Sequence, residues 1–183
     1  MISRNLVNMI RSNTDKLGEK WMRAVKESER MKAYQKLSDE ELKKRNRVFF
    51  ENLVGWIDEG AASDDIKSYF ARIGRERYNE RIPLDEINFA IIIAKKVLWN
   101  FILSEGFFSN ALAIYQALEM LTVMYNFFDL GSFYIGKEYQ EEMYEKIKTS
   151  GKFSEEELDE YIFPGKHITK KELEDLFGIH TFS

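Results

Sequence analysis

The stretch PLDEINFAIIIAKKVLWNFIL, residues 83–103, decides the fold of this chain. Pro83 suits the first turn of a helix, where its missing N–H costs nothing, and Asp85 and Glu86 suit the positive end of the helix dipole. At about 100° per residue the polar side chains fall on one narrow arc, and almost everything else is apolar. A helix this apolar must be covered on more than one side. The stretch therefore predicts a central helix, or one that contributes to a subunit interface.

Helix-start signals lie upstream of this stretch. Ser38 and Glu41 form a capping box, in which the serine side chain accepts a hydrogen bond from the backbone three residues later. Thr14-Asp15 can cap an earlier helix, and Ser63 can cap the helix that precedes residues 83–103. Each signal is followed by apolar residues at helical spacing. These patterns predict consecutive helices in the first part of the chain.

A second long helix is predicted over residues 109–149. Its first half is apolar apart from a thin polar stripe, and its second half is charged, so the helix begins inside the core and leaves it. A length of roughly forty residues is far above the usual length of a helix. We therefore predict a kink or a break near Gly131 or Gly136.

The composition supports an all-α fold. Hydrophobic residues make up 44% and charged residues 32%, which is typical of a globular chain. The chain of 183 residues has only two prolines and ten glycines, fewer turn residues than a strand-rich chain of this length needs. We predict one helical domain over residues 1–150. Residues 151–183 form an acidic C-terminal appendage with short helices that start near Ser154 and Thr169.

Residues for catalysis or for binding a metal or haem are poorly represented. Cysteine is absent, which removes disulfides, thiolate metal sites and cysteine nucleophiles. The two histidines, His167 and His180, lie in the appendage, whereas a globin-type haem or a di-iron bundle needs histidine on core helices. No nucleophile elbow and no glycine-rich phosphate loop is present. We therefore predict no enzymatic activity and no cofactor.

The charge and hydropathy patterns bear on partners and on location. A net charge of −4 gives no electrostatic case for nucleic acid. Residues 106–128 carry one charge, Glu119, over a length that could cross a bilayer, but their interspersed polar side chains favour a buried core helix. The first residues contain no uninterrupted apolar run of a secretory signal. We expect a cytoplasmic protein that does not bind nucleic acid or a membrane.

Three groups of side chains are candidates for binding. The aromatic set either forms plain core or lines an apolar pocket, for which the candidates are Trp56, Phe89, Trp99, Phe101 and Tyr125. Candidates for a dimer interface on the apolar helix are Ile91, Val97, Leu98 and Ile102. A third group consists of arginines that either meet an anionic ligand or form a mixed-charge face with Glu76 and Glu80, the second being favoured; these are Arg72, Arg75, Arg77 and Arg81.

The segment YFARIGRERYNERIPLDEINFAIIIAKKVLWNFIL, residues 69–103, resembles the N-terminal domain of the RsbR/RsbRD group, the RsbT co-antagonist proteins of bacterial stress signalling. The resembling features are a helix that ends in a basic and polar turn, then Ile82-Pro83-Leu84, then an apolar helix that carries Trp99. The resemblance extends over about residues 10–149. It implies a globin-like helical domain that binds no haem, forms dimers and works as a sensory or protein-interaction module, usually before a STAS or kinase output domain.

Two functions follow as expectations. The first is a non-catalytic sensory or signalling module that acts by homodimerisation and by contact with a signalling protein of STAS or kinase type. The alternative is a binding protein for an apolar small molecule, such as a fatty acid, held among the aromatic side chains. What covers the second face of residues 83–103, another subunit or a ligand, distinguishes the two.

Overall fold

The computed structural model describes residues 4–59, 64–104, 111–162 and 172. Within these ranges the chain forms helices and no strand, so the all-α prediction is confirmed. The elements are α1 (Arg4–Ser12), α2 (Thr14–Glu27), the 3-10 turn η1 (Tyr34–Lys36), α3 (Asp39–Asp58), α4 (Asp64–Asn79), α5 (Leu84–Ser104), α6 (Ala111–Thr149) and α7 (Glu155–Ile162). The arrangement is consistent with the globin-like fold that the resemblance implies.

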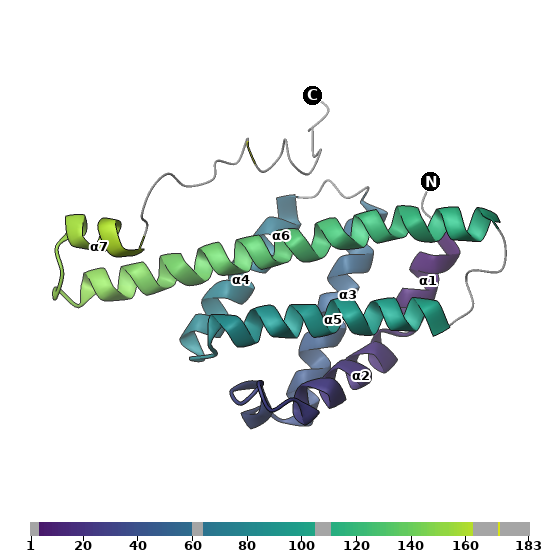
Figure 1. Ribbon diagram of the computed structural model, residues 1–183, viewed down its shortest axis with the longest axis horizontal. Helices are drawn as coiled ribbons and strands as arrows, with labels where there is room; N and C mark the ends of the chain where they lie inside the picture. Colours follow the sequence, from purple (N-terminus) through teal and green to yellow (C-terminus); the bar gives the residue numbers. More distant parts are fainter. Residues whose placement is uncertain (1–3, 60–63, 105–110, 163–171, 173–183) are drawn as a thin grey trace.

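The helices pack in two layers (Figure 1). Helix α6 runs the length of the molecule beside α5, and α3 crosses behind both at a steep angle. Helix α4 packs along α6, whereas α2 packs along α3 and against α5. The short α7 folds back beside the end of α6. This arrangement leaves α2, α3, α4 and α5 around one interior region.

The helix starts agree in part with the sequence patterns. Ser38 accepts a hydrogen bond from the Glu41 N–H at 3.2 Å, so the serine cap of the predicted capping box forms, while the Glu41 side chain pairs with Arg45. The predicted cap at Thr14-Asp15 is wrong, because Asn13 is the N-cap and Thr14 is already helical. The side chain of Asn13 instead donates to the Met9 carbonyl in the preceding helix. The predicted cap at Ser63 lies outside the described residues.

Helix α6 is continuous over its 39 residues, so of the kink or break predicted near Gly131 or Gly136, the break does not occur. A Cβ atom on Gly131 would lie 2.8 Å from the ring of Phe70. On the facing helix, a Cβ atom on Gly74 would lie 2.6 Å from the Ile135 carbonyl oxygen. Gly131 and Gly74 therefore allow α4 and α6 to approach closely, and α6 does not break at Gly131.

Aromatic side chains form the centre of the core. The ring of Phe127 on α6 packs 5.3 Å from that of Phe49 on α3 and 5.0 Å from that of Phe70 on α4. Trp56 also contacts Phe127, at 5.6 Å between ring centroids. Burying one side chain of this size stabilises the fold by roughly 1.5–3 kcal/mol. These contacts hold α3, α4 and α6 together as one unit.

Helix α5 has the length and the hydropathy of a membrane-crossing helix. One side of it is nevertheless buried in the protein, through Ile87, Ala90, Ala94 and Leu98. The core helix of a soluble protein passes the same test of length and composition. Helix α5 also packs against both α2 and α6, so the prediction of a helix covered on more than one side is confirmed. Its exposed side chains form a narrow arc that includes Asp85, Ile92 and Lys96.

Candidate functional site

A cavity of about 280 Å³ lies between α2, α3, α4 and α5. Its apolar wall comes mainly from α5 and α3, through Ile87, Ala90, Ile91, Ala94, Val48 and Phe49, with Trp21, Ile73 and Ile135 from neighbouring helices. Tyr34, Tyr69 and Asn46 add polar atoms. Charged side chains from α3 and α4 complete the lining, and we call them the lip: Glu41, Lys44, Arg45, Arg72, Glu76, Arg77 and Glu80.

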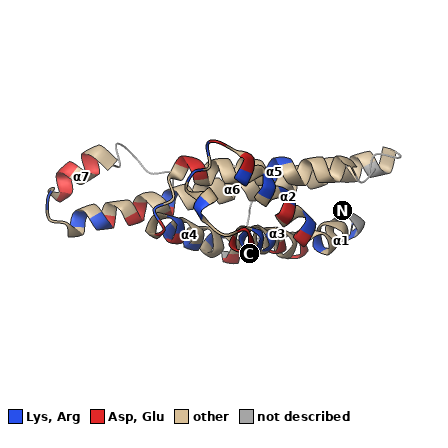
Figure 2. Ribbon diagram, turned by 90° about the horizontal axis from the view of Figure 1, so that it is seen from below, with Lys and Arg blue, Asp and Glu red and all other residues tan. Residues whose placement is uncertain are grey.

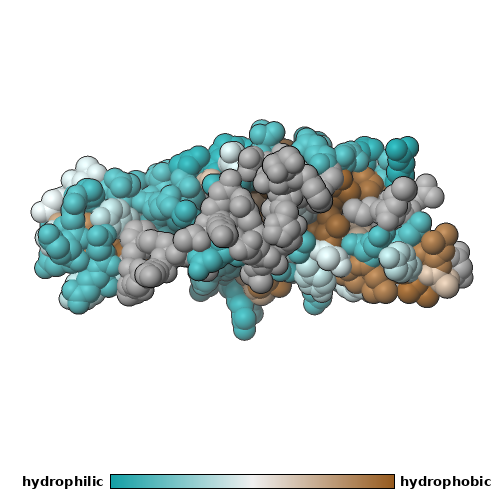
Figure 3. Space-filling model, turned by 90° about the horizontal axis from the view of Figure 1, so that it is seen from above, coloured by the Kyte–Doolittle hydropathy of each residue, from teal (hydrophilic) through white to brown (hydrophobic). Residues whose placement is uncertain are grey.

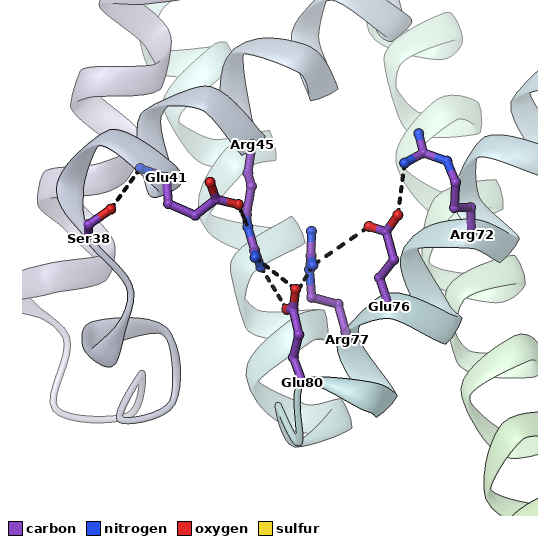
Figure 4. Close-up of polar contacts among 7 residues, drawn as sticks. All are labelled: Ser38, Glu41, Arg45, Arg72, Glu76, Arg77 and Glu80. Carbon is purple, nitrogen blue, oxygen red and sulfur yellow. Dashed lines mark hydrogen bonds and ion pairs between the residues drawn. The ribbon is translucent and has the colours of Figure 1, made fainter.

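Arg45 joins the two helices of the lip (Figure 4). Its two terminal nitrogens each donate to one oxygen of Glu80 on α4, both at 2.8 Å. Its Nε donates to Glu41, one turn earlier on α3, at 2.6 Å. This fork-like pairing with a carboxylate is the strongest form of ion pair in proteins. It fixes α3 against the end of α4.

Arg77 continues the chain of charges along α4. Its side chain is only 9% exposed, and it donates to Glu80 at 2.8 Å. Glu76 lies between Arg77, at 3.8 Å, and Arg72, which donates to Glu76 at 3.0 Å. The predicted pair of Arg72 and Glu76 is therefore present. A mixed-charge face is confirmed for this part of α4, and it lines a cavity, which the sequence did not indicate.

Two carboxylates of the lip, Glu41 and Glu80, are held in their ionised form by the arginines beside them. The hydrogen bond from Arg45 holds the pKa of Glu41 below its ordinary value of 4.5. Partial burial raises the pKa of Glu80, but the hydrogen bonds and charges of Arg45 and Arg77 outweigh it, and the net pKa is lowered. Burial raises the pKa of Tyr34 and of Tyr69, so both phenols stay neutral.

Two interior groups define the polar character of the cavity wall. Asn46 is 3% exposed, and its buried amide oxygen has no hydrogen-bond partner. A buried acceptor without a donor costs about 1–3 kcal/mol. Trp21, by contrast, is satisfied, because its indole N–H donates to the Ala90 carbonyl of α5 at 2.9 Å. The amide oxygen of Asn46 is therefore an unsatisfied acceptor of this wall.

None of the aromatic residues that we predicted for a pocket lines this cavity. Trp56 and Phe101 are buried in the core, Phe89 and Trp99 are half-buried, and Tyr125 is exposed. Trp99 and Tyr125 do meet, at a cleft of only about 10 Å³. The aromatic side chains that do line the cavity are Trp21, Tyr34, Phe49 and Tyr69. The sequence feature that does lie at the cavity is the cluster of alternating Arg and Glu on α4.

The predicted interface residues lie on the covered side of α5. Ile91, Leu98 and Ile102 are buried within this chain, and Val97 is half-buried. A second subunit cannot reach the three buried side chains without opening the fold. Successive side chains on a helix lie about 100° apart, so Ile92 is exposed although its neighbour Ile91 is buried.

A different apolar surface is exposed, and we call it the apolar face. It consists of large apolar side chains in the middle and at the end of α5 and in the first half of α6, each 43–66% exposed: Ile92, Leu103, Leu112, Ile114, Tyr115, Leu118 and Tyr125. Figure 3 shows hydrophobic surface at this end of the molecule, and Figure 2 shows that charged residues gather over the rest. Exposed apolar surface of this kind is typical of an interaction site.

Metal ligands do not cluster in the part of the chain that the structure describes, where no group of three or more His, Asp or Glu residues could hold an ion. His167 and His180 lie outside that part.

Residues 15–149 match the family model of the RsbT co-antagonist protein rsbRD N-terminal domain. The matched region spans α2 to α6 and so includes both the cavity and the apolar face. No curated protein and no solved structure gave a significant match.

Proposed function

Because the chain belongs to the family of RsbT co-antagonist protein RsbRD N-terminal domains, we propose that it is a non-catalytic cytoplasmic signalling module that acts through homodimerisation. The family is one of stress-signalling regulatory domains. The proposal adds the means by which such a domain acts. A dimer presents two copies of whatever surface the signalling partner recognises, and it changes that surface when the two subunits move.

The apolar face carries the proposal. Leu112, Tyr115 and Leu118 are each more than half exposed, at 66%, 61% and 56%. They lie three residues apart on α6, and so they share one side of the helix. Ile92 and Leu103 of α5 extend the same apolar face. A second copy is the occupant that we propose, because two such surfaces bury each other in a symmetric contact.

The signalling partner is proposed to be a protein of STAS or kinase type. The family membership alone supports this part. The charged second half of α6 offers a separate surface for that contact, since it lies away from the apolar face. Dimerisation and partner contact therefore use different parts of the same helix in this proposal.

Sedimentation velocity of the purified protein tests the dimer. We expect a species of twice the chain mass of 21.7 kDa. Leu118→Glu places an uncompensated charge in the interface, which costs about 3–5 kcal/mol and weakens association more than 100-fold. Gln140→Glu is the matched control, because Gln140 is exposed on the charged half of the same helix. A wild-type monomer at high concentration, or equal effects of the two substitutions, would contradict the proposal.

The cavity supports a second function, the binding of a small molecule. This was the alternative expected from the sequence. The cavity between α2, α3, α4 and α5 supports it, although none of the five predicted aromatic residues lines that cavity. The two functions are compatible, because the cavity and the apolar face share no residue.

A further inference from the structure

We propose that the cavity between α2, α3, α4 and α5 binds an uncharged, mostly apolar molecule about the size of two fused rings, which donates one hydrogen bond to Asn46. This inference concerns the ligand site alone and does not depend on dimerisation. It specifies the size, the charge and the polar group of the ligand. Each of the three comes from a different observation on the cavity.

The size follows from the volume. An engineered apolar cavity of about 150 Å³ holds one benzene molecule. The cavity here is about 280 Å³, nearly twice that volume, so a bicyclic molecule fits. Most of its interior wall is aliphatic or aromatic, including Ile87, Ala94 and Phe49. Such a wall binds the body of the ligand through apolar burial.

The charge follows from the lip. Every guanidinium nitrogen of Arg45 already donates to Glu41 or Glu80. An anionic ligand must therefore compete with ionised carboxylates that are held in place by two helices. A cationic ligand meets the mostly buried Arg45 and Arg77, which are 16% and 9% exposed. A cation is thus disfavoured, and an anion finds no unoccupied nitrogen on Arg45, so an uncharged molecule is the class that this part of the lip favours.

The polar group follows from Asn46. Its side chain lines the cavity, and its amide oxygen is buried without a donor. A ligand hydroxyl or N–H supplies that donor and removes the cost of the unsatisfied acceptor. Burial raises the pKa of Tyr34 and of Tyr69, so these two phenols of the cavity wall are neutral at pH 7 and add no charge to it. A ligand with an apolar body and one uncharged hydrogen-bond donor therefore matches this wall.

Three bicyclic probes of nearly equal shape separate these features: 2-naphthol, naphthalene and 2-naphthoate. Isothermal titration calorimetry, with the 183-residue chain in the syringe and the probe in the cell, overcomes the low solubility of naphthalene. We expect 2-naphthol to bind about tenfold more tightly than naphthalene, which is the effect of one hydrogen bond. We expect 2-naphthoate to bind more weakly than 2-naphthol by tenfold or more.

Ala94→Leu tests where the probe binds. Ala94 is 2% exposed and lines the cavity, so the added side chain fills space that the ligand needs. We expect a loss of 2-naphthol binding of at least tenfold. The matched control is Ala24→Leu, because Ala24 is half-buried on α2 and does not line the cavity. Circular dichroism and thermal melting of both variants report whether each still folds.

Asn46→Leu tests the polar group without depending on a loss of binding. Removing an unsatisfied buried amide raises the melting temperature or leaves it unchanged. The proposal predicts that naphthalene binding persists while the tenfold preference for 2-naphthol disappears. The proposal is overturned if none of the probes binds the wild-type protein, if Ala94→Leu and Ala24→Leu bind 2-naphthol equally well, or if 2-naphthoate binds best. A preference for 2-naphthol that survives Asn46→Leu would equally refute the role of Asn46.

Discussion

The two halves of α6 differ in what covers them. In residues 131–149 the helix lies against α4 so closely that Gly74 fits beneath Ile135, and the Tyr139 hydroxyl donates to the Ile82 carbonyl at 3.1 Å. In residues 111–130 one side packs into the core through Met120, Met124 and Phe127, whereas the other side carries exposed apolar residues. The half with fewer charges therefore has an apolar side that no other described part of the chain covers.

This difference separates stability from assembly within one helix. The second half has its partner, α4, in the same chain, and its exposed surface is charged (Figure 2). The first half presents Leu112 and Leu118 to solvent. Burying their apolar surface in a contact would gain about 25 cal/mol for each Å² removed from water. Substitutions in the second half should therefore act on folding, and those on the exposed side of the first half should act on association.

The largest effect is expected at the contact between α4 and α6. Gly74→Ala places a Cβ atom 2.6 Å from the Ile135 carbonyl oxygen, and the helices must move apart. We expect a loss of about 2–3 kcal/mol in the free energy of unfolding, measured by urea denaturation. Gly136→Ala is the control, since its Cβ meets nothing within 4 Å, and it should stabilise α6 by about 0.5–1 kcal/mol. Equal effects of the two substitutions would show that the glycines do not mark a close contact.

A smaller effect is expected from one hydrogen bond. Tyr139→Phe in the second half removes the bond to Ile82 and should lower the free energy of unfolding by about 1 kcal/mol. Tyr125→Phe makes the same change in the first half, where Tyr125 is 50% exposed. It should change stability by less than about 0.5 kcal/mol. Denaturation of both variants under identical conditions compares the halves directly, and a larger effect at Tyr125 would reverse the assignment.

The smallest effect is expected from the ion pair between Arg75 and Glu138, which joins α4 to the second half of α6. Arg75 is 46% exposed, so the pair is screened by water. Glu138→Gln should lower stability by less than about 1 kcal/mol in dilute buffer, and the difference should shrink at 1 M salt. A loss that persists at high salt would mean that Glu138 acts through packing instead of charge.

Sequence patterns predicted the helices better than their contacts. The serine caps at Ser38 and at Ser154, where a helix start was predicted, both form, because each depends on residues that are close in the chain. The break in α6 was wrong, because the reason for a glycine at 131 is Phe70 on another helix. A contact between helices that are distant in sequence leaves no periodic signal.

The candidate site was harder to predict for the same reason. Aromatic residues at helical spacing suggested a pocket, but Trp56 and Phe101 are core residues. The cavity instead uses alternating charges on α4, whose pairing with Arg45 of α3 depends on how the helices cross. The choice between Ile91 and Ile92 as outward residues likewise depended on the rotation of α5, which its nearly uniform apolar pattern does not fix.

Hydrogen–deuterium exchange at two protein concentrations tests the uncovered half of α6 most directly. Peptides from the two halves of the helix report in the same experiment, and α7 and the second half serve as an internal reference. If a second copy covers the apolar face, then peptides from residues 111–130 and from the end of α5 exchange more slowly at high concentration, while those from residues 131–149 do not change. Exchange that is independent of concentration in both halves, or protection confined to the charged half, would contradict the account.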